Sequence, residues 1–347
     1  MSFAQTLLNW YQVNKRDLPW RSTNDPYIIW LSEVILQQTR VDQGLPYFHR
    51  FSENYPTVDD FAQATEDEIL RHWQGLGYYS RGRNMHKTAR MVMEEHAGYF
   101  PRKYDELIRL KGIGEYTAAA ISSFSAGEPR AVVDGNVYRV LSRYFGISVP
   151  VNSSKGKKIF SDLAGELLDR DQPALFNQAI MEFGALQCKP RNPDCAICPL
   201  RMECIARREN LIRELPVKIK ANPPRARYFN YLILANNGRL AMQKRETRDI
   251  WQNLYEFPLI ETPEPAVPSE LLQRPEFRKF WGGPGQAKAV TGPVIHQLSH
   301  QKIHAQFIEV AGIELSDNQS VLWKHPDETE GLAVPKLISD FLKNYLS

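Results

Sequence analysis

Hydrophobic side chains recur at spacings of three and four through residues 1–213, which is the period of amphipathic helices. Segments with this spacing include FAQTLLNWYQV, YIIWLSEVILQQTRV, YDELIRL, YTAAAISSFSA, NVYRVLSRYF and KIFSDLAGELL. Turn signals separate them, at NDP, at GLG and at GIG. No strand-like alternation stands out in this part of the chain. The pattern therefore predicts an all-α first domain.

The pattern changes after this helical part. The stretch LPVKIKANPPRAR holds three prolines, which disfavour a helix, and four basic residues, so we expect an extended basic linker over 216–227. The β-rich runs that follow are YFNYLILANN, RLAMQKRE, NLYEFPLI and IHAQFIEVAG, and turn residues separate them. VPKLISDFLKNYL is typical of a closing helix, with Pro335 near its first turn. We therefore expect an α+β domain over 228–347.

Composition adds limits to this picture. The 347 residues are 43% hydrophobic and 24% charged, which excludes a disordered chain and suffices for two domains with cores. The formal charge of +3 does not by itself indicate a nucleic-acid partner. No apolar run approaches the ~18 residues of a membrane span, and the N-terminus lacks an apolar signal-peptide core. We expect a soluble, cytoplasmic protein, associated with the nucleoid in a bacterium.

The four cysteines lie close together in the sequence. They are Cys188, Cys195, Cys198 and Cys204, separated by six, two and five residues. Zinc ribbons usually have two CxxC knuckles, whereas this set has one and is confined to a single loop. Four thiolates in such a loop favour a [4Fe–4S] cluster. A zinc site or unrelated buried thiols remain the alternatives.

The stretch LKGIGEYTAAAI predicts a helix–hairpin–helix. Its turn consists of Lys111, Gly112, Ile113 and Gly114, with a helical pattern on each side. Two glycines allow the backbone to approach a phosphate, and the N–H groups of the following helix can bind the anion. Such contacts position DNA without reading its sequence. The alternative is an ordinary tight turn.

A basic stretch with interleaved aromatic residues covers positions 71–90. It has five Lys or Arg and no acidic residue, and it contains Trp73, Tyr78 and Tyr79. Basic side chains can contact phosphates, and aromatic rings can stack on bases or wedge between them. A solvated helix face beside a core aromatic cluster is the equally weighted alternative.

Two carboxylates are candidates for acid–base chemistry. Glu33 lies in the apolar pattern YIIWLSEVILQQ, where burial would raise its pKa and make it a general acid near neutral pH. Asp134 precedes a predicted helix start, where the N-terminus favours an ionised carboxylate. Such a pair suits cleavage of an N-glycosidic bond. The alternatives are an ion pair of Glu33 with Arg16 or Arg21, and a helix cap at Asp134.

Together these motifs resemble the helix–hairpin–helix base-excision DNA glycosylases with an iron–sulfur cluster, the superfamily of endonuclease III. The order is WLSEVILQQT, GLGYYSRGRN, LKGIGEYTAAAI, VVDGNVYRVLSR and the cysteine loop, within residues 1–213. Glu33, Tyr116 and the additional C-terminal domain resemble the MutY family within it. The resemblance implies a mainly α glycosylase domain over 1–215, with a [4Fe–4S] loop over 188–204, and a Nudix-like α+β domain over 228–347.

The resemblance also implies an activity. In endonuclease III a lysine that opens the DNA strand occupies the position of Tyr116, and a phenol cannot form a Schiff base. We therefore expect a monofunctional, monomeric enzyme that hydrolyses the N-glycosidic bond of adenine paired with 8-oxoguanine or guanine in double-stranded DNA. It would leave an abasic site and have no membrane partner. The rivals are a glycosylase for thymine or uracil at mismatches and a non-enzymatic, DNA-binding iron–sulfur protein.

Residue roles follow from the matching motifs. Glu33 is expected to protonate N7 of adenine, and Asp134 to stabilise the oxocarbenium ion through a covalent acetal, with Tyr116 and Asn136 supporting that carboxylate. Further expected roles are DNA binding by Lys111, Gly112, Ile113 and Gly114, wedging into the duplex by Gln38 and Tyr78, and lining of the adenine pocket by Arg16, Leu18, Trp20 and Arg21.

The C-terminal part resembles the MutY family more weakly. YEFPLI at 255–260 fits a recurring strand motif, and LSH at 298–300 occupies the place of the FSH loop that senses 8-oxoguanine. Leu298 replaces the intercalating aromatic residue, while Ser299 and His300 remain to hydrogen-bond the lesion. No Glu-rich Nudix box follows YEFPLI, so we expect no pyrophosphatase activity.

Overall fold

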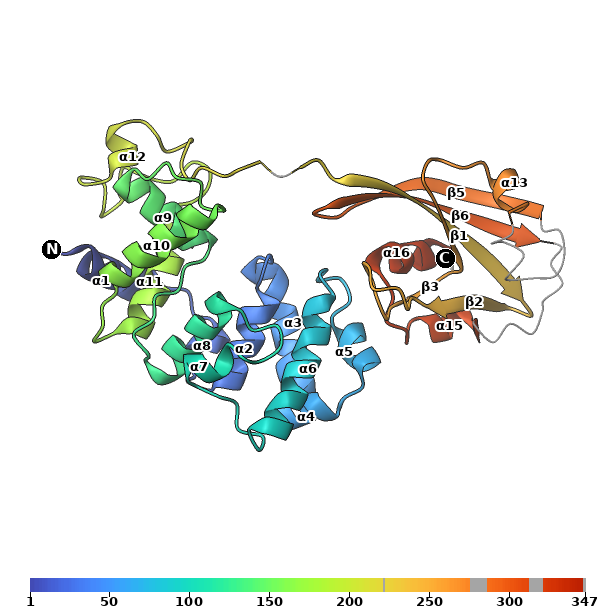
Figure 1. The fold of residues 1–347 in the computed structure, drawn as a ribbon, viewed down its shortest axis with the longest axis horizontal. Coiled ribbons are helices and arrows are strands. Elements are labelled where there is room, and N and C mark those ends of the chain that lie inside the picture. The colour runs from blue at the N-terminus through green and yellow to red at the C-terminus, as the bar shows by residue number, and fades with distance from the viewer. Residues whose placement is uncertain (221, 275–285, 312–320, 346–347) are drawn as a thin grey trace. The chain divides into compact units, whose positions relative to one another are not determined.

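The chain forms two compact units, one helical and one built on a mixed β-sheet (Figure 1). The computed structural model describes residues 1–347 apart from 221, 275–285, 312–320 and 346–347. Residues 1–63 and 84–220 make up the first unit, and residues 64–83 and 221–347 the second. The expected fold class, a mainly α domain followed by an α+β domain, is confirmed. No helix in the described ranges has both the length and the apolar character needed to cross a bilayer.

The first unit consists of short helices. They are α1 (Phe3–Asn14), the 3-10 helix η1 (Pro19–Arg21), α2 (Pro26–Ile35), α3 (Val41–Asn54), α4 (Val58–Gln63), most of α6 (Ser80–Glu95), α7 (Tyr104–Leu107), α8 (Glu115–Ala126), α9 (Gly135–Phe145), α10 (Ser154–Leu167), α11 (Pro173–Leu186) and α12 (Ile205–Arg208).

Helix α2 lies at the centre of one half of this unit. Its start is set by Asp25, whose side chain accepts a hydrogen bond from the Tyr27 N–H, and by Pro26 at the first helical position. The helix is buried along almost its whole length and packs against η1, α3 and α8. Because no face is left to solvent, Glu33 on this helix is buried as well.

The other half of the unit is built around α9 and α11, which pack against each other. Helix α11 also contacts α1 and α8, and α9 also contacts α10 and α12. Apolar residues of these helices form one core that includes Val140, Phe160 and Phe183. The start of α9 faces α11 at Gly184, where an added Cβ would lie 2.6 Å from the Cβ of Asn136. This close approach holds the N-terminus of α9 against α11.

The predicted helix–hairpin–helix turn joins α7 to α8. Gly112 has a φ of +80°, in the left-handed region that favours glycine. An added Cβ there would lie 2.7 Å from the Cβ of Asn84. Both the backbone conformation and the packing therefore require glycine at this position.

The second unit is built on a seven-stranded mixed sheet, counted over the described residues. Its elements are α5 (Glu66–His72), β1 (Arg225–Asn236), β2 (Arg239–Lys244), β3 (Tyr255–Glu256), β4 (Leu259–Thr262), α13 (Pro268–Leu271), β5 (Gln286–Gln297), β6 (Gln301–Ala311), β7 (Leu322–Lys324), α15 (Pro326–Thr329) and α16 (Lys336–Tyr345). The order is β3-β2-β1-β6-β5, with β4 on β1 and β7 on β2.

Strand β1 is the axis of this sheet and runs parallel to β6, with Arg225 opposite Gln301 and Leu234 opposite Val310. It begins inside the segment predicted as linker, because the backbone of residues 225–227 already pairs with β6. The closing helix is confirmed as α16, and its Phe341 ring stacks on Phe307 of β6 with centroids 3.9 Å apart.

Candidate active site

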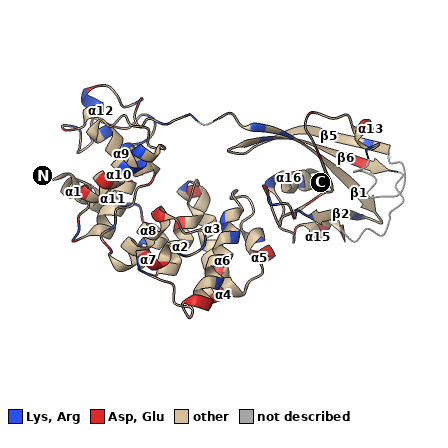
Figure 2. Cartoon of the chain, viewed as in Figure 1, with Lys and Arg blue, Asp and Glu red and all other residues tan. Residues whose placement is uncertain are grey.

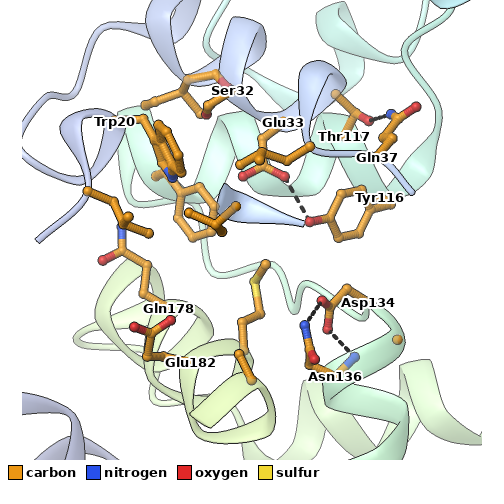
Figure 3. A pocket seen from close by; sticks show the side chains of 18 of the residues that line it. Trp20, Ser32, Glu33, Gln37, Tyr116, Thr117, Asp134, Asn136, Gln178 and Glu182 are labelled. Carbon is orange, nitrogen blue, oxygen red and sulfur yellow. Dashed lines mark hydrogen bonds between the residues drawn. The ribbon is translucent and has the colours of Figure 1, made fainter. Parts of the chain in front are cut away.

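A cavity of about 650 Å³ in the first unit lies between α2, α8, the start of α9 and α11 (Figure 3). Its size is that of a pocket for a small ligand. The residues expected to do the chemistry or to hold adenine line it together with Gln38, the expected wedge: Arg16, Leu18, Trp20, Arg21, Glu33, Tyr116, Asp134 and Asn136. These residues come from segments up to 120 positions apart (from Arg16 to Asn136), and the fold brings them together around one cavity.

Glu33 projects from α2 into this cavity, and its side chain is buried. Burial raises its pKa to about 7. The hydrogen bond from Tyr116 works against this shift, the charge of Asp134 adds to it, and the charge of Arg21 opposes it. The carboxyl group is therefore half-protonated near neutral pH, as a general acid requires.

Tyr116 does not support the carboxylate for which it was expected. Its hydroxyl donates a 2.8 Å hydrogen bond to Oε2 of Glu33 rather than to Asp134. The reason is the packing of α8 against α2, which turns the first residues of α8 toward Glu33. The expectation that Tyr116 holds Asp134 is wrong in this respect, whereas its place in the pocket agrees with the prediction.

Asp134 is the N-cap of α9. Its Oδ1 accepts hydrogen bonds of 2.8 Å from the N–H groups of Asn136 and Val137, and its Oδ2 accepts one of 2.6 Å from the Asn136 amide. Burial raises the pKa of Asp134, and these three donors oppose the shift because they stabilise the charged form. The residue is thus both a cap and a carboxylate facing the cavity, and Asn136 supports it as predicted.

The alternative interpretation of Glu33, as an ion-pair partner of Arg16 or Arg21, is wrong. Both arginines bind Glu182 of α11, with 2.7 Å between each Nη2 and Oε2 of Glu182. Hydrogen bonds from the two arginines outweigh the effect of burial and lower the pKa of Glu182 to about 2. The Glu33 carboxyl group instead accepts its hydrogen bond from Tyr116.

Sequence reasoning missed several residues that line this pocket, among them Gln178 and Glu182, which lie one turn apart on α11. The Tyr11 hydroxyl donates to Oε1 of Gln178 at 2.9 Å. A signal was available for Glu182, because it is the one charged residue of the helix PALFNQAIMEFGAL. A buried carboxylate needs a cationic partner, and the arginines of RDLPWR could have been proposed.

Of the four hairpin residues, only Gly114 lines the cavity. Lys111, Gly112 and Gly114 are exposed, whereas Ile113 is buried, so its side chain serves the core. Gly114 caps α8 and also lines the cavity. The exposed N-terminus of α8 is available for an anion.

The remaining predicted site residues lie in the second unit. Tyr78, Leu298, Ser299 and His300 line a cavity of about 510 Å³, and the hydroxyl groups of Tyr78 and Ser299 hydrogen-bond each other. The LSH segment forms the turn between β5 and β6, closed by a hydrogen bond from the Leu298 N–H to the Gln301 carbonyl.

Two interpretations were open for the aromatic residues of the basic stretch at 71–90: contact with DNA, or packing in the core. Trp73 and Tyr79 are buried, so for them the core interpretation is right. Tyr78 is 48% exposed and has a φ of +46°, an uncommon conformation for a bulky residue. Of the three rings, that of Tyr78 is available to a partner.

The four cysteines are half-buried thiols on one loop beside α9. Burial raises the pKa of Cys195, Cys198 and Cys204, and the charge of Cys188 adds to the shift of each. In the described part of the chain, no group of three or more His, Cys, Asp or Glu is arranged to hold a single metal ion. Four neighbouring thiols fit a four-iron cluster by their chemistry, because such a cluster takes four cysteine ligands.

Comparisons with known proteins agree with this geometry. The profile described as HhH-GPD superfamily base excision DNA repair protein matches residues 31–163, and that of the NUDIX domain matches residues 230–344. The adenine DNA glycosylase of Buchnera aphidicola (subsp. Acyrthosiphon pisum) is 31% identical over 99% of this chain and 97% of its own. That of Homo sapiens is 35% identical over 89% of this chain and 67% of its own.

Solved structures resemble the helical part. A thermostable thymine-DNA glycosylase is 31% identical, with a TM-score of 0.56, over 60% of this chain and 95% of that one. Endonuclease III in a non-covalent DNA complex is 22% identical, with a TM-score of 0.52, over 60% of this chain and 94% of that one. The second likeness concerns the fold alone.

Proposed function

The chain belongs to the adenine DNA glycosylases of the HhH-GPD base-excision repair superfamily, and we propose that it removes adenine paired with 8-oxoguanine or with guanine. The observation that carries the proposal is one cavity with two carboxyl groups in opposed environments. Glu33 is buried and has one donor, whereas Asp134 is held by three donors at a helix N-terminus. Such a pair supplies an acid and a stabilising carboxylate.

The reaction follows from these environments. Protonated Glu33 gives its proton to N7 of the flipped adenine, and the electron pair of the C1′–N9 bond leaves with the base. The sugar becomes an oxocarbenium ion, which Asp134 stabilises and traps as an acetal. Water then adds its hydroxyl to C1′ and its proton to the Glu33 carboxylate, which releases Asp134 and leaves an abasic site. Tyr116 has no amine to attack the sugar, so the strand stays intact.

The adenine itself would be held by the rest of the cavity. Leu18 and Trp20 are buried and offer apolar surface to the base. Arg16 and Arg21 stand at the same wall, with Glu182 between them. Gln38 is exposed with a φ of +59°, and this uncommon backbone supports a role as a wedge into the duplex.

DNA would be positioned by backbone N–H groups and basic side chains that contact its phosphates and do not read its bases. The exposed hairpin presents N–H groups at the start of α8, together with Lys111. Figure 2 shows further basic residues on the segment with α12. Arg207 and Arg208 of this helix are exposed. A [4Fe–4S] cluster held by Cys188, Cys195, Cys198 and Cys204 would fix the shape of this basic loop.

Recognition of 8-oxoguanine would fall to the second unit. Ser299 and His300 are exposed in the turn between β5 and β6 and offer hydrogen bonds. Leu298 is partly buried and aliphatic, so it contributes contact without aromatic stacking. Tyr78, which lines the same cavity, carries the aromatic ring.

The test is a single-turnover assay on duplexes with adenine opposite 8-oxoguanine, compared with A·G, A·C, T·G and U·G. Each reaction is analysed with and without alkali. Breaks at adenine only after alkali are the expected result, fastest opposite 8-oxoguanine, and Glu33→Gln should abolish them. Removal of thymine or uracil instead would favour the likeness to the thymine-DNA glycosylase and overturn the proposal. Tight binding without release of any base would favour the non-enzymatic rival.

A further inference from the structure

Glu182 is a buried carboxylate at the wall of the active-site cavity. Its side chain is 1% exposed, and among the described residues its hydrogen-bond donors are Arg16 and Arg21. Arg16 donates its backbone N–H and its Nε to Oε1 at 2.9 and 2.8 Å, and its Nη2 to Oε2 at 2.7 Å. Arg21 donates its Nη2 to the same Oε2 at 2.7 Å.

The arrangement also fixes the two arginines relative to each other. Nη1 of Arg21 donates a 3.1 Å hydrogen bond to the backbone carbonyl of Arg16, so Arg21 is bound on both of its terminal nitrogens. The arginine side chains are only 35% and 16% exposed. The Glu182 carboxylate therefore binds both arginines at the edge of the cavity. Without this carboxylate, the positive charges of Arg16 and Arg21 would have no anionic partner there.

The position of these two arginines matters for Glu33, because they line the same cavity. The ionisable side chains that line the same cavity are Arg16 and Arg21 beside η1, Glu115 and Tyr116 on α8, Asp134 before α9, Tyr138 on α9 and Glu182 on α11. Helix α3 contributes the uncharged Val41. Arg16 and Arg21 are thus the cations of this cavity wall. A cation near a carboxyl group favours its ionised form, which cannot donate a proton.

We propose that Glu182 is a positioning residue for adenine excision: it holds Arg16 and Arg21 at the adenine pocket and withholds their charge from Glu33. The proposal rests on the proposed function of Glu33 as the acid. Glu182 does not touch the reacting atoms, and its effect passes through the two arginines. An unbound Arg21 would be free to pair with Glu33 and displace the Tyr116 contact.

The test is the pH profile of single-turnover adenine excision by the full chain, from pH 5.5 to 9. Glu182→Gln keeps the shape of the side chain and removes its charge. We expect the alkaline midpoint of the profile to move about one unit toward acid, so that the rate falls about tenfold at pH 8 but only about twofold at pH 6. Glu182→Asp keeps the charge and should restore the midpoint of the unmodified protein, even where its rate is lower.

Arg21→Gln provides a second test, which can be measured even if Glu182→Gln does not fold. It removes a cation, so the midpoint should move in the opposite direction, toward alkaline pH. A merely structural role predicts an equal loss of rate at every pH, with no shift of either sign. An equal loss in Glu182→Gln, or shifts of the same sign in both variants, would overturn the proposal.

Failure of this inference differs from failure of the proposed function. If the unmodified protein releases no adenine, or Glu33→Gln remains active, the function or the role of Glu33 is wrong. If the unmodified protein is active, Glu33→Gln is inactive and the midpoints of Glu182→Gln and Arg21→Gln stay in place, the role of Glu182 alone is wrong.

Discussion

The Tyr116 hydroxyl lies 2.8 Å from Oε2 of Glu33 and donates a hydrogen bond to it. This contact joins α8, which follows the hairpin turn, to α2, which carries Glu33. A donor to a carboxylate favours its ionised form, whereas burial favours the protonated form, and burial has the larger effect here. The acidity of Glu33 is therefore a balance between the two.

Tyr116→Phe should shift this balance. Loss of the donor removes an interaction that lowers the pKa of Glu33, so the alkaline limb of the excision profile should move up by about one pH unit. Single-turnover rates between pH 6 and 9 provide the measurement. Tyr99→Phe is the matched control, because Tyr99 is 81% exposed. An unchanged limb would show that the hydrogen bond does not tune the acid.

The unmodified protein should itself show a pH dependence near neutrality. Burial raises the pKa of Glu33 to about 7, so the acid is protonated below this value and loses its proton above it. The excision rate should level off below pH 7 and fall about tenfold per unit above it. A rate that stays constant from pH 7 to 9, measured with bound DNA in excess enzyme, would contradict this assignment.

Substitutions of Asp134 should separate its two roles. Asp134→Asn keeps an oxygen that can accept from the Asn136 and Val137 N–H groups but loses the charge, so the fold should persist while excision falls at least about a hundredfold. Asp134→Ala also loses the cap and should cost about 1 kcal/mol of stability. Thermal unfolding and excision assays on both variants provide the comparison. Near-normal excision by Asp134→Asn would remove this residue from the chemistry.

Gly112→Ala should destabilise the hairpin. The new Cβ would require a φ of +80° and would lie 2.7 Å from the Cβ of Asn84, so we expect a loss of about 1–3 kcal/mol and weaker DNA binding. Gly165→Ala is the control, because Gly165 lies inside α10 with open space at its Cβ position. That change should stabilise the helix by up to about 1 kcal/mol. Equal unfolding free energies in the two variants would refute the packing argument.

The sequence by itself determined the local structure and the set of candidate functional residues. The helical period, the prolines and the glycine turn predicted the elements, because these depend on neighbours a few positions apart. Asp134 as a helix cap and the need for glycine at position 112 are of this kind. The motifs, read through the family resemblance, also named ten of the residues that line one cavity.

Only the tertiary structure decided which side chains meet. Tyr116 was expected at Asp134 but binds Glu33, because the packing of α8 on α2 sets its direction. Arg16 and Arg21 were possible partners of Glu33, yet both bind Glu182, which lies more than 160 positions away in the chain. Spacing along the sequence carries no information on such distant pairs. The fold sets them by placing residues of α11 and η1 around one cavity, and with them the charges near Glu33.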